Sequence, residues 1–128
     1  MNNKITATAA FFGMTAIILG AFGAHALKKV LTIDQLATFE TGVKFQMYHA
    51  LFLLFVGLNS HLSEKIKKTI LNLTTAGIIF FSGSIYLLAT DSLNSLNFKV
   101  IGFITPIGGL FLIGSWGLVM WNYLKKMA

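Results

Sequence analysis

The sequence predicts an all-α integral membrane protein, a four-transmembrane-helix bundle built as a single domain over residues 1–128. Of the 128 residues, 55% are hydrophobic and only 11% are charged, whereas soluble domains carry about 25% charged residues. A helix needs about 20 mostly apolar residues to cross a bilayer, and four such stretches fill nearly the whole chain. Too few residues remain outside them for a soluble catalytic domain.

The four predicted helices follow one another with short polar connections. Their approximate bounds are residues 5–27, 43–62, 69–90 and 100–124. A membrane-spanning backbone must satisfy its hydrogen bonds internally, and these stretches have the length of helices rather than of barrel strands. We therefore expect four helices and a helical bundle.

The first predicted helix also resembles a signal peptide, because Lys4 precedes an apolar stretch that ends in Ala24-His25-Ala26. Three further apolar spans follow, so we expect an uncleaved helix. Small residues recur along one of its faces at spacings of four, three, four and four, namely Ala9, Gly13, Ala16, Gly20 and Ala24. Such a stripe lets the backbone of a neighbouring helix approach closely.

The third and fourth predicted helices carry further small residues, which are Gly77, Gly83, Gly102, Gly109 and Gly117. We interpret these residues and the stripe on the first helix as helix-packing positions, within one protomer or between protomers of a homo-oligomer. A ligand groove or a gate is the alternative interpretation.

The connection between the first two spans predicts a structure of its own. Thr32 and Gln35 match a capping box, in which each side chain binds a free backbone N–H of the other. Apolar residues then recur at helical spacing as far as Val43. We expect a short interfacial helix that lies at the membrane surface and ends near Gly42. An irregular polar loop is the alternative.

Pro106 divides the fourth predicted helix. Proline is favoured in the first turn of a helix, and Thr105 before it is a good N-cap. A helix over residues 106–124 would be about 28 Å long, enough to span a membrane by itself. Residues 100–104 would then form a separate entry segment. A continuous helix with a kink is the alternative.

The charge indicates lipid headgroups as partners. The net charge of +6 comes from ten lysines without any arginine, and lysines that flank apolar spans suit anionic lipid better than nucleic acid. Six lysines share the predicted side of both termini and four share the other side. The positive-inside rule therefore favours cytoplasmic termini. The chain has no cysteine, which excludes disulfides and thiolate sites.

Polar residues gather at the membrane face opposite the termini. The predicted topology brings nine of them towards this face: His25, Glu40, Lys44, Gln46, Tyr48, His49, Tyr86, Asp91 and Thr105. The predicted helix bounds place His25 and His49 within a few ångströms of the same depth. We expect a His25–Glu40 or a His49–Asp91 hydrogen bond, because ionisable groups inside a membrane need partners.

This polar cluster has three interpretations. Two histidines at one depth suit a haem or a metal ion, although a single pair lacks the usual number of ligands. They also suit a proton or solute path of a small carrier or channel, because histidine titrates near neutral pH. The interpretation we favour is a hydrogen-bonded network that holds residues 28–42 on the bundle. No hydrolase triad or phosphate-binding loop is present, so we expect no enzyme activity, metal or cofactor.

Four motifs carry a family resemblance. They are GAFGAHAL at 20–27, FETGVKFQMYHA at 39–50, FSGSIY at 81–86 and TPIGG at 105–109. In this order they resemble the YgdD-like small membrane proteins, a bacterial family of unknown function with related eukaryotic transmembrane proteins. The resemblance implies a four-helix protein of the bacterial inner membrane and supplies no activity. It directs attention to the polar and proline positions of the motifs, His25, Glu40, Gln46, His49, Ser82, Tyr86, Thr105 and Pro106. The expected role is structural, or that of a partner for lipids or membrane proteins.

Overall fold

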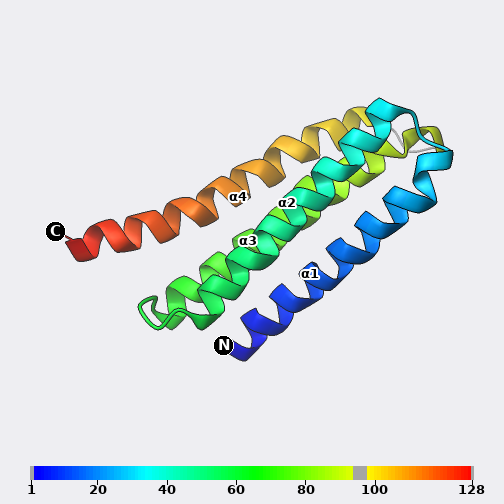
Figure 1. Cartoon of the computed structure of the whole chain (residues 1–128). Helices are drawn as coiled ribbons and strands as arrows, with labels where there is room; N and C mark the ends of the chain where they lie inside the picture. The colour runs from blue at the N-terminus through cyan, green and yellow to red at the C-terminus, as the bar shows by residue number, and fades with distance from the viewer. Residues whose placement is uncertain (1, 94–97, 128) are drawn as a thin grey trace.

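The computed structural model describes residues 2–93 and 98–127, and four long helices account for most of them. These helices are α1 (Asn2–His25), α2 (Ile33–Leu58), α3 (Glu64–Ala89) and α4 (Phe98–Met127) (Figure 1). Short 3-10 turns, η1 (Leu27–Lys29) and η2 (Asp91–Leu93), follow α1 and α3. All four helices are long and apolar enough to cross a membrane. The predicted all-α fold with four membrane-spanning helices is confirmed.

The helices pack in the order of the chain. α1 packs against α2, α2 against α3, and α3 against α4. Both termini and the connection from α2 to α3 lie at one end of the bundle, which we call the terminal end (Figure 1). α2 and α3 bury more of their length than α1 and α4, so α1 and α4 are the outer helices.

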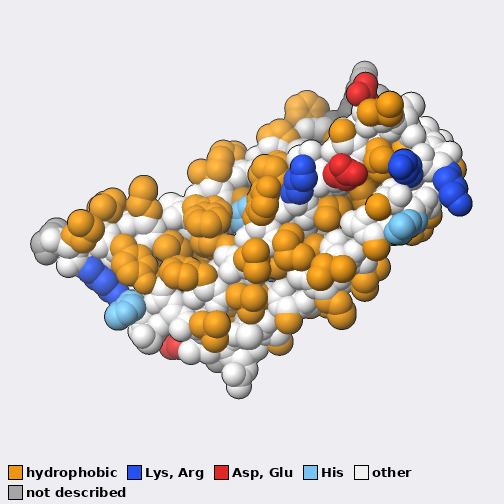
Figure 2. Space-filling view, viewed as in Figure 1, with side chains coloured by type: hydrophobic (Ala, Val, Ile, Leu, Met, Phe, Trp, Pro, Cys, Tyr) orange, Lys and Arg blue, Asp and Glu red, His pale blue; other side chains and the backbone are white. Residues whose placement is uncertain are grey.

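Two groups of apolar side chains form the core. The larger joins α1, α2 and α3 through residues such as Ile5, Leu53 and Ile70, and it takes Leu112 from α4. The smaller closes the end opposite the termini, where Phe39 packs with Leu27 and other side chains. Hydrophobic side chains also cover the middle of the visible surface, while Lys, Asp and Glu gather towards its two ends (Figure 2). This distribution suits a helix bundle surrounded by lipid.

The separate interfacial helix is not confirmed, because α2 runs without a break through Gly42. The capping box itself is present. The Gln35 N–H donates to the Thr32 hydroxyl at 3.1 Å, and the Thr32 N–H donates to Oε1 of Gln35 at 3.0 Å. The helix that starts there continues, since a single glycine weakens a helix by only about 1 kcal/mol.

The division of the fourth helix at Pro106 is wrong, and the continuous alternative holds. α4 begins at Phe98, so Pro106 lies inside it and Thr105 is not an N-cap. The Thr105 hydroxyl instead donates to the carbonyl oxygen of Ile101 at 3.4 Å and shares a hydrogen bond with Ser84 of α3. Thr105 therefore binds the preceding turn of α4 and connects α4 to α3, instead of starting a helix.

The small residues of α1 face α2. Ala9 and Ala16 are buried, and a methyl group added at Gly20 would lie 3.4 Å from Val43. Gly13 faces Ala50 at 3.8 Å, whereas Ala24 is exposed. The stripe thus supports close packing of α1 on its neighbour in the chain.

The glycines of α3 and α4 differ in their surroundings. A Cβ at Gly77 would lie 2.6 Å from Leu112, and one at Gly109 would lie 3.5 Å from Phe81. The closest approach is at Gly108, where a Cβ would lie 2.3 Å from the backbone nitrogen of Phe81. Three glycines have nothing within 4 Å of such a Cβ, and these are Gly83, Gly102 and Gly117.

Candidate functional site: an interhelical hydrogen-bond network

Gln46 of α2 is the centre of the network, because its side chain binds both neighbouring helices. It is 4% exposed. Its Nε2 donates to the carbonyl oxygen of Phe12 at 2.9 Å and to the hydroxyl of Thr15 at 2.7 Å, both on α1. Its Oε1 accepts from the Tyr86 hydroxyl of α3 at 2.6 Å. Both N–H groups and the oxygen are in use, so this buried amide is satisfied.

A second contact joins α2 to α3 one turn away. The Ser82 hydroxyl donates to the carbonyl oxygen of Gly42 at 2.8 Å. The ring of Tyr86 lies against Gly42, where a Cβ would come within 2.6 Å of it. Glycine at this position therefore permits both the tyrosine contact and access to the carbonyl group.

His49 joins α2 to α4. The ring is 5% exposed. Its Nδ1–H donates to the carbonyl oxygen of Phe45 at 2.7 Å, and its Nε2 accepts from the indole N–H of Trp116 at 3.0 Å. The rings of Phe52 and Trp116 lie against it. Because Nε2 accepts a hydrogen bond, the ring proton lies on Nδ1 alone, and His49 is a neutral residue that connects two helices.

Pairs of hydroxyl groups connect α3 to α4. The Thr74 hydroxyl donates to the Ser115 hydroxyl at 2.9 Å, and both residues are 0% exposed. Ser84 and Thr105 form the other pair. A hydroxyl inside a membrane needs a partner, and these four residues supply partners for one another.

Further polar contacts tie the helices at the terminal end. The amide of Asn59 donates to the Tyr123 hydroxyl at 2.6 Å, and the ammonium of Lys67 donates to Oδ1 of Asn2 at 2.9 Å. Lys126 donates to the carbonyl oxygen of His61. Sequence spacing does not predict these pairs, because the two partners of each pair lie far apart in the chain.

The structure separates several of the predicted cluster residues. His25, Glu40, Tyr48 and Pro106 are exposed, and Asp91 is partly buried. His25 and Glu40, both of which the structure describes, form no hydrogen bond or ion pair with each other. The expected His49–Asp91 hydrogen bond does not form either, because Phe45 and Trp116 bind both ring nitrogens of His49.

The prediction that the two histidines lie at the same depth in the membrane is wrong, and the reason is the start of α2. His25 is the last residue of α1, but α2 begins at Ile33 rather than near residue 43. His49 therefore lies about 24 Å along α2, at 1.5 Å per residue. The histidines occupy different regions of the bundle and do not form one site.

The network joins helices and holds no obvious ligand set. Within residues 2–93 and 98–127 there is no group of three or more His, Asp or Glu side chains that would hold a metal ion. In the same part of the chain, every buried side-chain nitrogen and oxygen has a hydrogen-bond partner. Thr15, Thr74, Ser115 and Trp116 belong to this network but were not predicted, because helical hydroxyls usually bind their own backbone.

Comparison with known proteins identifies the family. Residues 19–109 match the family described as "Protein of unknown function (DUF423)". The chain belongs to the DUF423 family. This match confirms the resemblance to YgdD-like proteins, and YgdD itself is one of the relatives of the chain.

Curated relatives cover most of the chain. A UPF0382 membrane protein of Haemophilus influenzae is 38% identical over 127 residues, which are 98% of each chain. The UPF0382 membrane protein YwdK of Bacillus subtilis is 38% identical over 120 residues, 89% of this chain and 90% of the relative. The UPF0382 inner membrane protein YgdD of Escherichia coli is 33% identical over 118 residues, 88% of this chain and 82% of the relative. No solved structure matches the chain. Together with the four apolar helices, these relatives show a membrane protein.

Proposed function

We propose that this DUF423 chain is a non-enzymatic protein of the bacterial inner membrane that binds lipid or another membrane protein through its outer surface. The observation that carries this proposal is the complete pairing of buried polar side chains across the described helices. Gln46 and His49 use their polar atoms to bind other parts of the bundle. The interior therefore favours a fixed structure, and we expect interactions with other molecules at the outer surface.

A proton or solute path through the two histidines has little support. Such a path needs titratable groups in succession, whereas His25 ends α1 and His49 lies deep in α2. His49 faces aromatic side chains, including Phe52 and Trp116. These surroundings favour a role for His49 in packing.

The proposed location is the inner membrane, with both termini in the cytoplasm. The relative from Escherichia coli is named an inner membrane protein. Six lysines lie within α1, α3 and α4 near the terminal end, against four towards the opposite end. This excess supports cytoplasmic termini under the positive-inside rule.

Purified protein in liposomes tests the proposal. A proton gradient across the liposomes, followed with a pH-sensitive dye, should decay at the same rate with and without the protein. The His49→Ala variant should leave this rate unchanged and lower the melting temperature. Proton flux that requires His49, combined with an unchanged melting temperature of the variant, would show a carrier or channel instead.

A further inference from the structure

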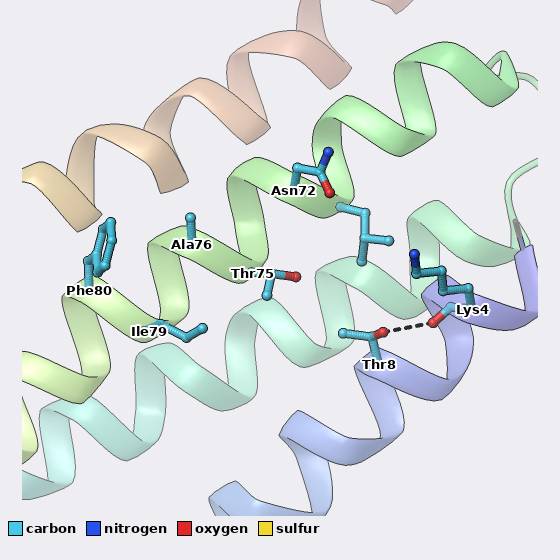
Figure 3. A pocket seen from close by; sticks show the side chains of 8 residues that line it. Lys4, Thr8, Asn72, Thr75, Ala76, Ile79 and Phe80 are labelled. Atoms are coloured by element: carbon cyan, nitrogen blue, oxygen red, sulfur yellow. Dashed lines mark hydrogen bonds between the residues drawn. The ribbon is translucent and has the colours of Figure 1, made fainter.

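A groove separates α1 from α3. Both helices pack on α2 but not along each other. Two hollows lie between them, of about 400 Å³ and about 280 Å³, and Ile79 lines both. Figure 3 shows the larger hollow, with Lys4 and Thr8 on α1 and the other labelled side chains on α3. The groove therefore continues from the terminal end of the bundle towards its middle.

The wall of the larger hollow contains polar groups without protein partners. The Asn72 amide and the Thr75 hydroxyl form no hydrogen bond with any residue that the structure describes. Thr8 is different, because its hydroxyl donates to the carbonyl oxygen of Lys4 at 2.8 Å. Asn72 lies about 12 Å along α3, within a segment apolar enough to span a membrane. Unpaired polar groups at such depth are costly, so these two groups need acceptors from outside the chain.

Positive charge surrounds the entrance of the groove. Lys4 lines the hollow from α1, and its side chain is exposed. Lys65 and Lys68 lie seven and four residues before Asn72, which places them on the same face of α3. The first turn of α3 also contains one carboxylate, Glu64. Three lysines against one glutamate leave the entrance positive.

The deeper part of the groove is mainly apolar, because the polar atoms of Thr15, Gln46 and Tyr86 in its wall bind one another. Phe11, Phe12 and Leu19 line it from α1, and Ile79 and Gly83 line it from α3. Gly83 faces open space, because nothing lies within 4 Å of a Cβ built there. Lys4 and Leu19 are separated by about 22 Å along α1. The groove thus has a cationic entrance, a polar segment and a long apolar track, in that order.

We propose that this groove binds one anionic phospholipid. The lipid phosphate accepts hydrogen bonds from Lys4 and is attracted by Lys65 and Lys68. Its ester carbonyl oxygens accept from Asn72 and Thr75, and an acyl chain follows the apolar track. This site rests on the lipid-binding part of the proposed function. With cytoplasmic termini, the entrance faces the leaflet where anionic lipids create a negative surface potential.

Native mass spectrometry tests the site. The protein is placed in nanodiscs that contain equal amounts of phosphatidylglycerol and phosphatidylcholine, then released into mild detergent so that retained lipids are counted. The wild type should retain one phosphatidylglycerol in preference to phosphatidylcholine. Lys4→Gln should weaken this retention about fivefold, the contribution of one lysine near an anionic membrane surface. The matched control Lys125→Gln removes the same charge from exposed α4 residue Lys125 and should retain lipid as the wild type does.

A second variant tests the groove by its shape. Ala76→Phe places a ring in the larger hollow without changing the charge, and it should abolish lipid retention. Ala10→Phe adds the same ring at an exposed position of α1 outside both hollows and should have no effect. Thermal unfolding checks that each variant is folded, and the surface variant Lys4→Gln decides the question if Ala76→Phe does not fold.

Three results would overturn the site. Equal losses in Lys4→Gln and Lys125→Gln would show a diffuse charge effect, and full retention in folded Ala76→Phe would show that lipid binds elsewhere. A wild-type protein that forms lipid-free dimers would show that a second copy covers the groove. None of these results changes the liposome flux measurement, so failure of the site and failure of the proposed function remain distinguishable.

Discussion

The indole N–H of Trp116 on α4 donates to Nε2 of His49 on α2 at 3.0 Å. Since Nε2 must be the acceptor of this bond, the ring proton is on Nδ1, which donates to the carbonyl oxygen of Phe45 at 2.7 Å. α2 and α4 do not pack along each other. This bond is therefore a local connection between a central helix and an outer helix.

Replacing His49 should destabilise the bundle. His49→Ala removes both hydrogen bonds and leaves a cavity beside Phe52 and Trp116, so we expect a loss of about 1–3 kcal/mol. Thermal unfolding of the detergent-solubilised protein measures the change. His25→Ala is the matched control, because His25 is exposed at the end of α1, and it should melt with the wild type. Equal effects of the two variants would contradict the assignment of His49 to the core.

Gln46 and Tyr86 should be energetically coupled. Gln46→Leu keeps the approximate volume but removes the bond to the Tyr86 hydroxyl, which measures 2.6 Å. A double-mutant cycle with Tyr86→Phe should give a coupling energy of about 0.6 kcal/mol, with about 1.7 kcal/mol as the upper bound for such bonds in membranes. Reversible unfolding in mixed micelles supplies the four free energies. Simple additivity would show that the bond contributes nothing.

Gly108 should tolerate no side chain. The Cβ of Gly108→Ala would lie 2.3 Å from the backbone nitrogen of Phe81, and a backbone atom in a helix cannot move away without separating α4 from α3. We expect a loss of about 3 kcal/mol or more, at or beyond the usual range for overpacking. Gly117→Ala is the control on the same helix, because its Cβ meets nothing within 4 Å. Its melting temperature should equal or exceed that of the wild type; a loss as large as that of Gly108→Ala would refute the explanation.

Removal of Asn2 alone should destabilise the protein more than removal of Asn2 together with the charge of Lys67. Lys67 is 1% exposed, and its ammonium donates to Asn2 at 2.9 Å. Asn2→Ala leaves a buried charge without this acceptor and should cost about 1–3 kcal/mol. Lys67→Met removes the charge and keeps most of the apolar volume, so the double variant Asn2→Ala/Lys67→Met should be more stable than Asn2→Ala alone. Chemical unfolding measures both, and a double variant less stable than Asn2→Ala would contradict the argument.

The helices could be predicted because each long apolar stretch is bounded by polar or charged residues. The start of the second helix could not, because a glycine such as Gly42 also suits the end of a helix. In the structure Gly42 lies within α2 and packs against Tyr86. A break at Gly42 predicts a helix start about ten residues after Ile33 and places His49 too close to the membrane surface. A glycine in a helical pattern can mark close packing as well as an end.

The candidate site could be predicted in part. The sequence motifs indicate Gln46, Ser82, Tyr86 and Thr105, and each of these residues forms a hydrogen bond between helices. The motifs do not indicate Thr74 and Ser115, although these two residues bind each other in the core. The sequence does not distinguish them from hydroxyls such as that of Thr69, which binds the backbone of its own helix. The face that each helix turns to its neighbour decides between these cases, and that face follows from tertiary packing.

The order of packing has a consequence for biogenesis. α1 lies against α2 and α3 lies against α4, so each helix has a packing partner next to it in the chain. The connection from α2 to α3 is short and lies at the terminal end. The protein is thus composed of two helical hairpins, and the first, α1 with α2, has its main contacts complete before the second is synthesised. Insertion into the bilayer can proceed one hairpin at a time. The two hairpins then dock through the α2–α3 interface.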